Sequence, residues 1–236
     1  MDKKLREAQF SVLKIFAKRA KVFALCGGTA LELFYLKHRF SADLDFFSPN
    51  YDPKEIKDLI TAFSNNLKAK IKLEAEFSRP GRAQVRFYTT SVRGTTRPLK
   101  IDFVEDILVK SPAIKKFNGL RVYSAKDIYL QKISAVTGIE VVTDEVSRAL
   151  MQGRRQARDI FDIYMLSKKI MPLHRFLKGV SGRYQRGMVH WYRTFSRQQL
   201  KLDLLDLDIY IKSFNAHEMI IYLEGEIKQF IKEVMQ

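Results

Sequence analysis

The stretch LCGGTALELFYLKHRFSADLDFFSP, residues 25–49, decides the fold. A short apolar run, residues 22–26, reaches two adjacent glycines, and residues 29–36 then predict a helix. Glycines at such a turn let the backbone approach a ligand, and a helix N-terminus favours a phosphate. Gly27 and Gly28 are therefore candidate phosphate-binding residues, although a tight strand-to-helix turn needs glycine for structural reasons as well.

Two aspartates, Asp43 and Asp45, alternate along a second predicted strand, residues 43–47. Alternate strand residues face the same side, so the two carboxylates point together while Leu44 and Phe46 face a core. Adjacent like charges repel unless a cation lies between them, and ligation by oxygen alone suits Mg²⁺. The apolar flanks of DLDFF argue against the alternative, an edge strand with two solvated acids. The pattern predicts a divalent metal site.

A third carboxylate, Asp102, lies in the apolar strand pattern LKIDFV, where an unpaired carboxylate would be costly. If this strand neighbours the strand of Asp43 and Asp45, Asp102 completes the set of acids that a two-metal site needs. Glu105 and Asp106 follow it and are expected at the surface.

The second half of the chain offers two further candidates. Lys132 sits in YLQKISAV, an otherwise apolar helix, where a buried stem can carry the ammonium to a phosphate. A lysine reaching along the helix to solvent is the structural alternative. In RRQARDIFDIYML, Asp159 and Asp162 share a helix face after three arginines, and Arg–Asp pairing beside an apolar stripe explains this equally well. Residue types alone leave both choices open.

The pattern of helices and strands changes along the chain. The first half predicts helices over residues 3–19, 29–36 and 53–67, and strands over residues 22–26, 43–47, 71–77, 84–88 and 99–104. Ser124 and Asp127 have capping-box spacing, and the helices predicted from there on span residues 124–135, 156–166, 182–195 and 216–234. We expect an α+β fold, with a small mixed β-sheet domain flanked by helices over residues 1–122 and a helical domain over residues 123–236.

Basic charge is concentrated in one part of the chain. The formal net charge is +16, and residues 148–201 hold 13 Lys/Arg against 2 Asp/Glu. This density favours a nucleic-acid-facing surface over an ordinary solvated one. Aromatic and basic residues interleaved there suit a single-stranded end, although Trp191 and Phe195, four apart, fit a helix core equally well. The other interleaved residues are Tyr184, His190 and Tyr192.

The composition excludes several protein classes. One cysteine, Cys26, rules out an intramolecular disulfide and a cysteine-based metal cluster. The first residues lack a signal-peptide pattern, and no apolar run approaches the roughly 18 residues of a membrane span. We expect a cytoplasmic protein without a membrane partner.

The motifs GGTAL, HRFSADLDFF, KIDF, QKISA and RDIFDIYML, in this order, resemble the AbiEii/AbiGii toxin family of nucleotidyltransferases, which includes the MenT-type tRNA-modifying toxins. This family lies within the DNA polymerase β-like nucleotidyltransferase superfamily. The likeness covers residues 22–166, about 60% of the chain. The resemblance implies metal-dependent transfer of a nucleoside monophosphate from a nucleoside triphosphate. The residues that it implies are Gly27, Gly28 and Ser41 for nucleotide contact, Asp43 and Asp45 for the metal, Lys132 for the triphosphate, and Asp159 as a second essential carboxylate.

One position departs from the wider superfamily, where Gly-Ser usually precedes the helix. Here Thr29 follows the two glycines, and its hydroxyl would replace that of the serine. The expected cofactor is Mg²⁺, as two ions held by Asp43, Asp45 and Asp102, with Mn²⁺ as an alternative. Arg39 is expected to add positive charge beside the phosphates.

The expected acceptor is the 3′ end of tRNA, or another RNA, bound through residues 148–201. The expected role is that of the toxin in a type IV-like toxin–antitoxin pair, with a separate antitoxin protein as partner. Two alternatives remain: the same chemistry on a small molecule or a protein, or a catalytically silent nucleotide- or RNA-binding module.

Overall fold

The computed structural model describes residues 2–78, 82–138, 141–143, 149–151, 153–154 and 156–234. Arg148 and Arg155 of the basic stretch lie outside the described residues. The chain divides into two compact units: unit 1 comprises Met1–Tyr35 and Phe40–Asp127, and unit 2 comprises Leu36–Arg39 and Ile128–Gln236. Four residues early in the sequence therefore belong with the C-terminal unit.

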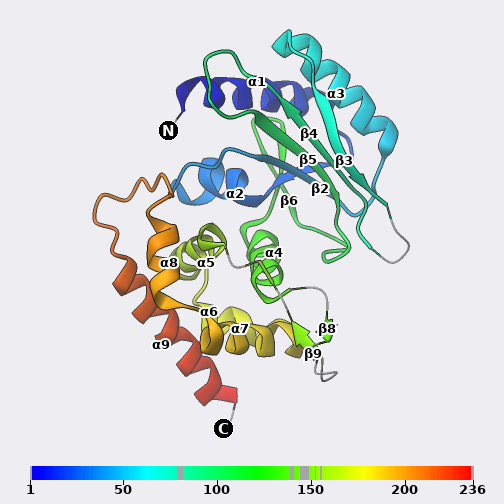
Figure 1. Ribbon diagram of the computed structural model, residues 1–236. Helices are drawn as coiled ribbons and strands as arrows, with labels where there is room; N and C mark the ends of the chain where they lie inside the picture. The colour runs from blue at the N-terminus through cyan, green and yellow to red at the C-terminus, as the bar shows by residue number, and fades with distance from the viewer. Residues whose placement is uncertain are drawn as a thin grey trace. The chain divides into compact units, whose positions relative to one another are not determined.

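Unit 1 is built on a seven-stranded mixed sheet of order β3-β4-β5-β2-β1-β7-β6 (Figure 1). Its strands are β1 (Ala24–Cys26), β2 (Leu44–Ser48), β3 (Lys72–Phe77), β4 (Val85–Thr90), β5 (Leu99–Glu105), β6 (Ile114–Phe117) and β7 (Leu120–Tyr123). Its helical segments are α1 (Lys3–Arg19), α2 (Gly27–Ala30), most of the π-helical turn η1 (Leu31–Leu36), α3 (Pro53–Leu67) and the start of α4 (Ala125–Thr137). The expected mixed sheet flanked by helices is confirmed.

Local capping chemistry sets the ends of the first helices. The Asp2 carboxylate accepts the Leu5 N–H at 3.0 Å and so satisfies one of the free donors at the start of α1. Asp52 caps α3 in the same way, and Pro53 occupies the first helical position, where its missing N–H costs little. The predicted bounds of both helices, 3–19 and 53–67, are confirmed.

One face of the sheet is covered by α1 and α3, which pack against each other. The Phe16 ring of α1 stacks on Phe46 of β2 with 4.0 Å between centroids, and Phe63 of α3 lies 6.3 Å from the same ring. Burial alternates along β2 and β5, so that Leu44 and Phe46 are buried while their neighbours on the other face are half-exposed. The second face of these strands is the one that carries the predicted carboxylates.

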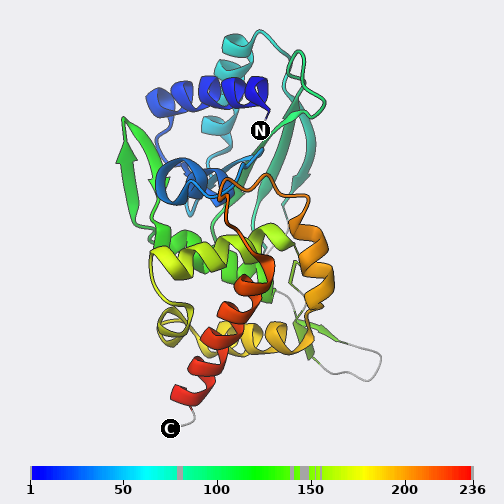
Figure 2. The same cartoon turned by 90° about the vertical axis from the view of Figure 1, so that its left-hand side faces the viewer.

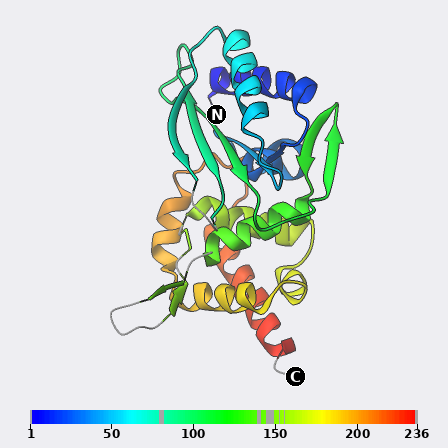
Figure 3. The same cartoon turned by 90° about the vertical axis from the view of Figure 1, so that its right-hand side faces the viewer.

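The hairpin of β6 and β7 was missing from the predicted strands. Asn118 and Gly119 join its strands, and both residues have positive φ, of 48° and 83°. Asn-Gly between two apolar-alternating runs is a strong hairpin signal, so the sequence contained the information. Figure 3 shows this hairpin (green) at the opposite end of the sheet from β3 and β4 (teal).

Unit 2 is helical apart from a two-stranded ribbon of β8 (Val141–Thr143) and β9 (Ala149–Met151). Its helices are the rest of α4, α5 (Ala157–Lys169), α6 (Leu173–Lys178), α7 (Gly182–Thr194), α8 (Arg197–Leu204) and α9 (Ala216–Val234). The long α9 contacts α5, α6, α7 and α8 and so organises the unit (Figure 2). Among the described helices, none combines the length and apolar composition that crossing a bilayer requires.

Ser124 caps the start of α4 as predicted, but only half of the capping box forms. The Asp127 N–H donates to the Ser124 hydroxyl at 3.2 Å, and that hydroxyl donates to the Asp127 carboxylate at 2.8 Å. The Ser124 backbone N–H donates instead to the Ala113 carbonyl oxygen at 2.8 Å, and the Asp127 carboxylate accepts the Ala113 N–H at 2.9 Å. These bonds therefore join the helix start to the segment that enters β6.

Candidate active site

Asp45 and Asp102 lie directly opposite each other in the parallel strands β2 and β5. Both side chains are half-exposed and both belong to the face that α1 and α3 leave uncovered. Asp43, two residues before Asp45, is half-exposed as well. Opposed residues in neighbouring strands have Cβ atoms roughly 5 Å apart, which brings two carboxylates within reach of one cation.

Gly27 explains why the glycine turn and the aspartate strand occur together. Cys26 of β1 pairs with Asp45, so the turn that follows β1 lies beside that carboxylate. Gly27 has φ +67°, a conformation that favours glycine, and a Cβ added there would overlap the Asp45 carboxylate. The glycine therefore makes room for the acid as well as allowing the turn.

The segment leading into β2 is held by a buried carboxylate that the sequence analysis missed. Glu32, 3% exposed in η1, accepts the Ser41 backbone N–H at 2.8 Å and forms an ion pair with Arg6 of α1. The Arg6 guanidinium also lies over the Phe40 ring, 4.6 Å from its centroid. A glutamate within the apolar run LELFYL was the available signal.

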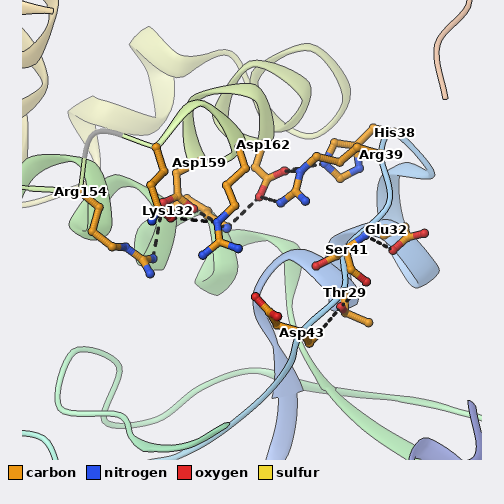
Figure 4. Close-up of polar contacts among 12 residues, drawn as sticks. Thr29, Glu32, His38, Arg39, Ser41, Asp43, Lys132, Arg154, Asp159 and Asp162 are labelled. Atoms are coloured by element: carbon orange, nitrogen blue, oxygen red, sulfur yellow. Dashed lines mark hydrogen bonds and ion pairs between the residues drawn. The ribbon is translucent and has the colours of Figure 1, made fainter. Parts of the chain in front are cut away.

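Two further side chains fix the backbone of the same segment. Gln9 of α1, fully buried, donates to the carbonyl oxygens of Ser41 at 2.9 Å and Ala42 at 2.8 Å. The Thr29 hydroxyl donates to the carbonyl of Asp43 (Figure 4). These hydrogen bonds fix the backbone that carries Asp43 and Asp45, because their acceptors are carbonyl oxygens at or just before Asp43. Contact of Thr29 with a nucleotide stays a prediction.

The donor set of β2 and β5 fits a hard divalent cation. Mg²⁺ in nucleotide enzymes is generally held by one or two carboxylates, with phosphate and water oxygens completing the octahedron. Asp45 and Asp102 supply such a pair on one face. In the part of the chain that the structure describes, no three His, Cys, Asp or Glu side chains converge as a complete metal site. The pair plus substrate oxygens is therefore the set that these residues suit, and Asp43 as a third ligand stays a prediction.

Unit 2 holds a second group of acids, and these are paired with cations. Lys132 of α4 donates to Asp159 at 2.7 Å and lies 2.8 Å from Asp162 (Figure 4). The Arg39 guanidinium donates two hydrogen bonds of 2.7 Å to the Asp162 carboxylate, and His38 Nε2 lies 2.7 Å from the same carboxylate. Asp159 and Asp162 are both fully buried. We call these five residues the buried ion cluster.

The pKa values in the buried ion cluster follow from this pairing. Burial acts to lower the pKa of Lys132, but Asp159 and Asp162 outweigh it and the pKa is raised. Burial acts to raise the pKa of Asp162, but Arg39 and Lys132 hold it well below the usual carboxyl range. Burial also opposes ionisation of Asp159, whose pKa is lowered by Lys132 and Arg154. All three groups stay charged at neutral pH.

Lys132, Asp159 and Arg39 were predicted site residues, whereas Asp162, which pairs with both Lys132 and Arg39, was noted only for sharing a helix face with Asp159. His38 was not predicted, and it lies 124 residues from Asp162 in sequence. The signal for Asp162 was its position among apolar residues on the face shared with Asp159, a feature that left a structural reading open. Contact of Lys132, Arg39 and Asp159 with a nucleotide stays a prediction.

One expectation about exposure was wrong, and burial decides between the two alternatives left open for Trp191. Asp106 is buried, 3% exposed, and accepts the backbone N–H groups of Leu108 and Val109, because it caps the turn after β5. Trp191 is 8% exposed and stacks on Phe195 with 4.4 Å between ring centroids, as a helix core residue does. Basic side chains on α7 such as Arg186 and Arg193 are exposed.

Comparison with protein families shows to which family the chain belongs. The family described as nucleotidyl transferase AbiEii toxin, type IV TA system, matches residues 12–226. The chain belongs to this family. It is a nucleotidyltransferase, and the family implies a nucleoside triphosphate substrate and a separate antitoxin. Divalent metals are the general cofactors of this superfamily.

Two solved structures share the fold. The crystal structure of JHP933 from Helicobacter pylori matches with a TM-score of 0.59 and 18% identity, over 100% of this chain and 94% of that one. A structure from H. pylori described as a candidate nucleotidyltransferase gives a TM-score of 0.59 and 18% identity, over 98% and 95% of the two chains. A comparison with curated protein sequences gives no match.

Proposed function

We propose that this nucleotidyltransferase moves a nucleoside monophosphate from a nucleoside triphosphate to the 3′ end of an RNA, with tRNA as the acceptor. The observation that carries the proposal is the opposed pair Asp45 and Asp102, next to the turn at Gly27. That arrangement joins a cation-binding pair to a backbone turn suited to phosphate.

At the α-phosphorus, one bond forms and one bond breaks. The acceptor hydroxyl oxygen bonds to the α-phosphorus and gives up its proton to solvent, the bond from that phosphorus to the bridging oxygen breaks, and pyrophosphate leaves with the electron pair. When bound by Asp43, Asp45 and Asp102, Mg²⁺ or Mn²⁺ ions would lower the pKa of the acceptor hydroxyl and neutralise the leaving pyrophosphate. The backbone at Gly28 and the Ser41 hydroxyl would orient the phosphates.

Charge supports RNA as the acceptor. Residues 148–201 hold 13 Lys/Arg against 2 Asp/Glu, and the arginines of α7 include exposed ones. Neutralising phosphates with Lys and Arg releases counterions, which is the main source of affinity for nucleic acids. A small-molecule acceptor would not need such a surface.

Two roles of Lys132 can be separated by experiment. The family resemblance implies that Lys132 contacts the triphosphate, whereas its ion pairs with Asp159 and Asp162 indicate that it stabilises unit 2. In Lys132→Met, a raised KM for the triphosphate in a folded protein would support the first role. A loss of unfolding free energy with an unchanged KM would support the second.

The test of the proposed function is label transfer. The protein is incubated with Mg²⁺, total tRNA and each of the four α-labelled nucleoside triphosphates in turn, with Asp43→Ala as the inactive control. We expect label on tRNA with one triphosphate and none in the variant, whose fold is retained because an acid repulsion is removed with the ligand.

Other outcomes would change the assignment. Label on the protein itself would favour protein nucleotidylation, and label on a small molecule would favour that acceptor class. Magnesium-dependent nucleotide binding without label anywhere would favour a silent binding module. Equal transfer by Asp43→Ala would remove Asp43 from the metal site.

A further inference from the structure

The row of paired residues that contains Asp45 and Asp102 continues across the sheet to an aromatic pair. Asp102 of β5 lies opposite Phe87 of β4, and Phe87 lies opposite Ala75 of β3. Phe77, two residues along from Ala75, meets the Phe87 ring edge-on at 5.9 Å between centroids. Phe77 and Phe87 therefore stand on the same face of the sheet as the carboxylates, one and two strands away.

This aromatic pair is accessible within unit 1. Phe77 is 53% exposed and Phe87 is half-exposed, although both are large apolar rings. The face that α1 and α3 cover is formed instead by buried residues such as Phe46 and Phe103. A single exposed phenylalanine is common on protein surfaces. Two exposed phenylalanine rings in contact, beside the carboxylate pair, form an apolar patch of the kind that marks a binding surface.

The order of the strands, β4-β5-β2-β1, indicates on which side of the carboxylate pair each substrate binds. Gly27, where a phosphate would bind, follows β1, which lies next to β2 and its Asp45. The β5 side, beyond Asp102, leads to Phe87 and Phe77. The attacking hydroxyl must lie roughly 3–3.5 Å from the α-phosphorus. With the triphosphate on the β1 side, the acceptor must approach from the β5 side.

Resting on the proposed function, we propose that Phe87 and Phe77 form a stacking platform for the last bases of a single-stranded RNA acceptor. RNA ends are recognised by stacking of unpaired bases on aromatic side chains, and open sheets with aromatics on neighbouring strands do this in other RNA-binding folds. Lys100, exposed and two residues before Asp102 on the same face, is placed to pair with a phosphate of that strand. Glu74 on this face is paired with Lys72 and Thr89.

The test uses a short single-stranded RNA with 2-aminopurine as its 3′-terminal base, because stacking quenches its fluorescence without any turnover. We expect quenching on binding to the wild-type protein and loss of most quenching in Phe77→Ala and Phe87→Ala. Phe87→Tyr should restore it and Phe87→Leu should not, since leucine fills the space without stacking. Phe10→Ala is the matched control: Phe10 is 52% exposed on α1, in the same unit.

Kinetics supply the second readout. The KM for RNA should rise about tenfold in Phe77→Ala, while the KM for the triphosphate stays unchanged. Phe77 is the first choice because it is exposed, so that its truncation should change the free energy of unfolding little. Asp43→Ala should lose transfer and keep quenching.

The fluorescence and kinetic measurements together distinguish an error in the stacking platform from an error in the proposed function. Transfer to RNA with quenching and KM unchanged in the Phe77→Ala/Phe87→Ala double variant would overturn the platform and leave the function standing. Absence of quenching in the wild type would also overturn it. Quenching that depends on Phe87, in a protein that labels no RNA, would support the platform and reject the acceptor assignment.

Discussion

The two units use the same residue type in opposite ways. In unit 1, Asp45 and Asp102 stand side by side on a half-exposed sheet face. In unit 2, Asp159 and Asp162 are fully buried, and Lys132 and Arg39 neutralise them. An acid that binds an exchangeable cation must remain reachable, whereas a buried acid needs a fixed cation partner. From this contrast we propose that the first pair serves the chemistry and that the second pair stabilises the fold.

The strongest way to break this contrast is to neutralise one acid of the unit 1 pair. Asp45→Asn removes the proposed metal ligand from a half-exposed position with little change in size, so transfer should fall on the order of a thousandfold, because metal stabilisation of the transition state amounts to several kcal/mol. The free energy of unfolding should change by less than about 1 kcal/mol. Steady-state label transfer and urea unfolding measure the two quantities. Asp58→Asn, an exposed acid of α3, is the control.

The reciprocal change in unit 2 should affect stability first. Asp162→Asn leaves Arg39 and Lys132 short of their shared partner in a buried site. The free energy of unfolding should fall by about 3 kcal/mol, as for other broken buried ion pairs. Urea unfolding measures this, with the exposed Asp206→Asn as control. A stable Asp162→Asn protein with transfer abolished would show that the buried ion cluster acts in the chemistry.

Gly27→Ala tests whether the turn after β1 positions the Asp45 carboxylate. Positive φ costs a residue with a side chain about 1–2 kcal/mol, and the new Cβ would displace the Asp45 carboxylate. We expect a modest loss of unfolding free energy together with a larger loss of transfer. Gly225→Ala in α9, where an added Cβ meets nothing within 4 Å, should change neither adversely. Full transfer by Gly27→Ala would mean that Asp45 tolerates displacement.

The smallest effect concerns pH. The lowered pKa values of Asp159 and Asp162 stabilise the fold above the unfolded carboxyl pKa of about 3.9, and this stabilisation is lost as pH falls through the folded values. The raised pKa of Lys132 stabilises below about 10.4 and is lost as pH rises through its folded value. The contribution of these three groups to the unfolding free energy should be constant between these limits, and Asp162→Asn should weaken the decline in acid. An identical acid decline in the variant would contradict this.

The sequence predicted what local chemistry determines. The limits of α1 and α3 followed from the spacing of their apolar residues and from Pro53 in the first turn. Strand alternation placed Asp45 on the face opposite Leu44 and Phe46, whereas Asp43 precedes β2 and its shared face with Asp45 stays a prediction. The β6–β7 hairpin was readable from Asn118 and Gly119 but was missed. Such features depend on residues a few positions apart.

Contacts between distant segments lay beyond sequence reasoning. Arg39 meets Asp162 across 123 residues, and Glu32 meets Arg6 across 26 residues, with no spacing rule to connect them. Asp106 looked like a surface acid because its role, capping a buried turn, depends on backbone geometry. Trp191 could have been a stacking residue or core until its burial was known.

Binding of Mn²⁺ in place of Mg²⁺ shows whether Asp45 and Asp102 hold the metal, because it is read by electron paramagnetic resonance and needs no turnover. The wild-type protein and Asp45→Asn would be titrated with Mn²⁺ in the presence of a non-hydrolysable nucleoside triphosphate, with Asp162→Asn alongside. We predict that Asp45→Asn loses protein-dependent Mn²⁺ binding and that folded Asp162→Asn retains it. Equal Mn²⁺ binding by the wild type and Asp45→Asn would contradict the assignment of the opposed carboxylates as the metal site.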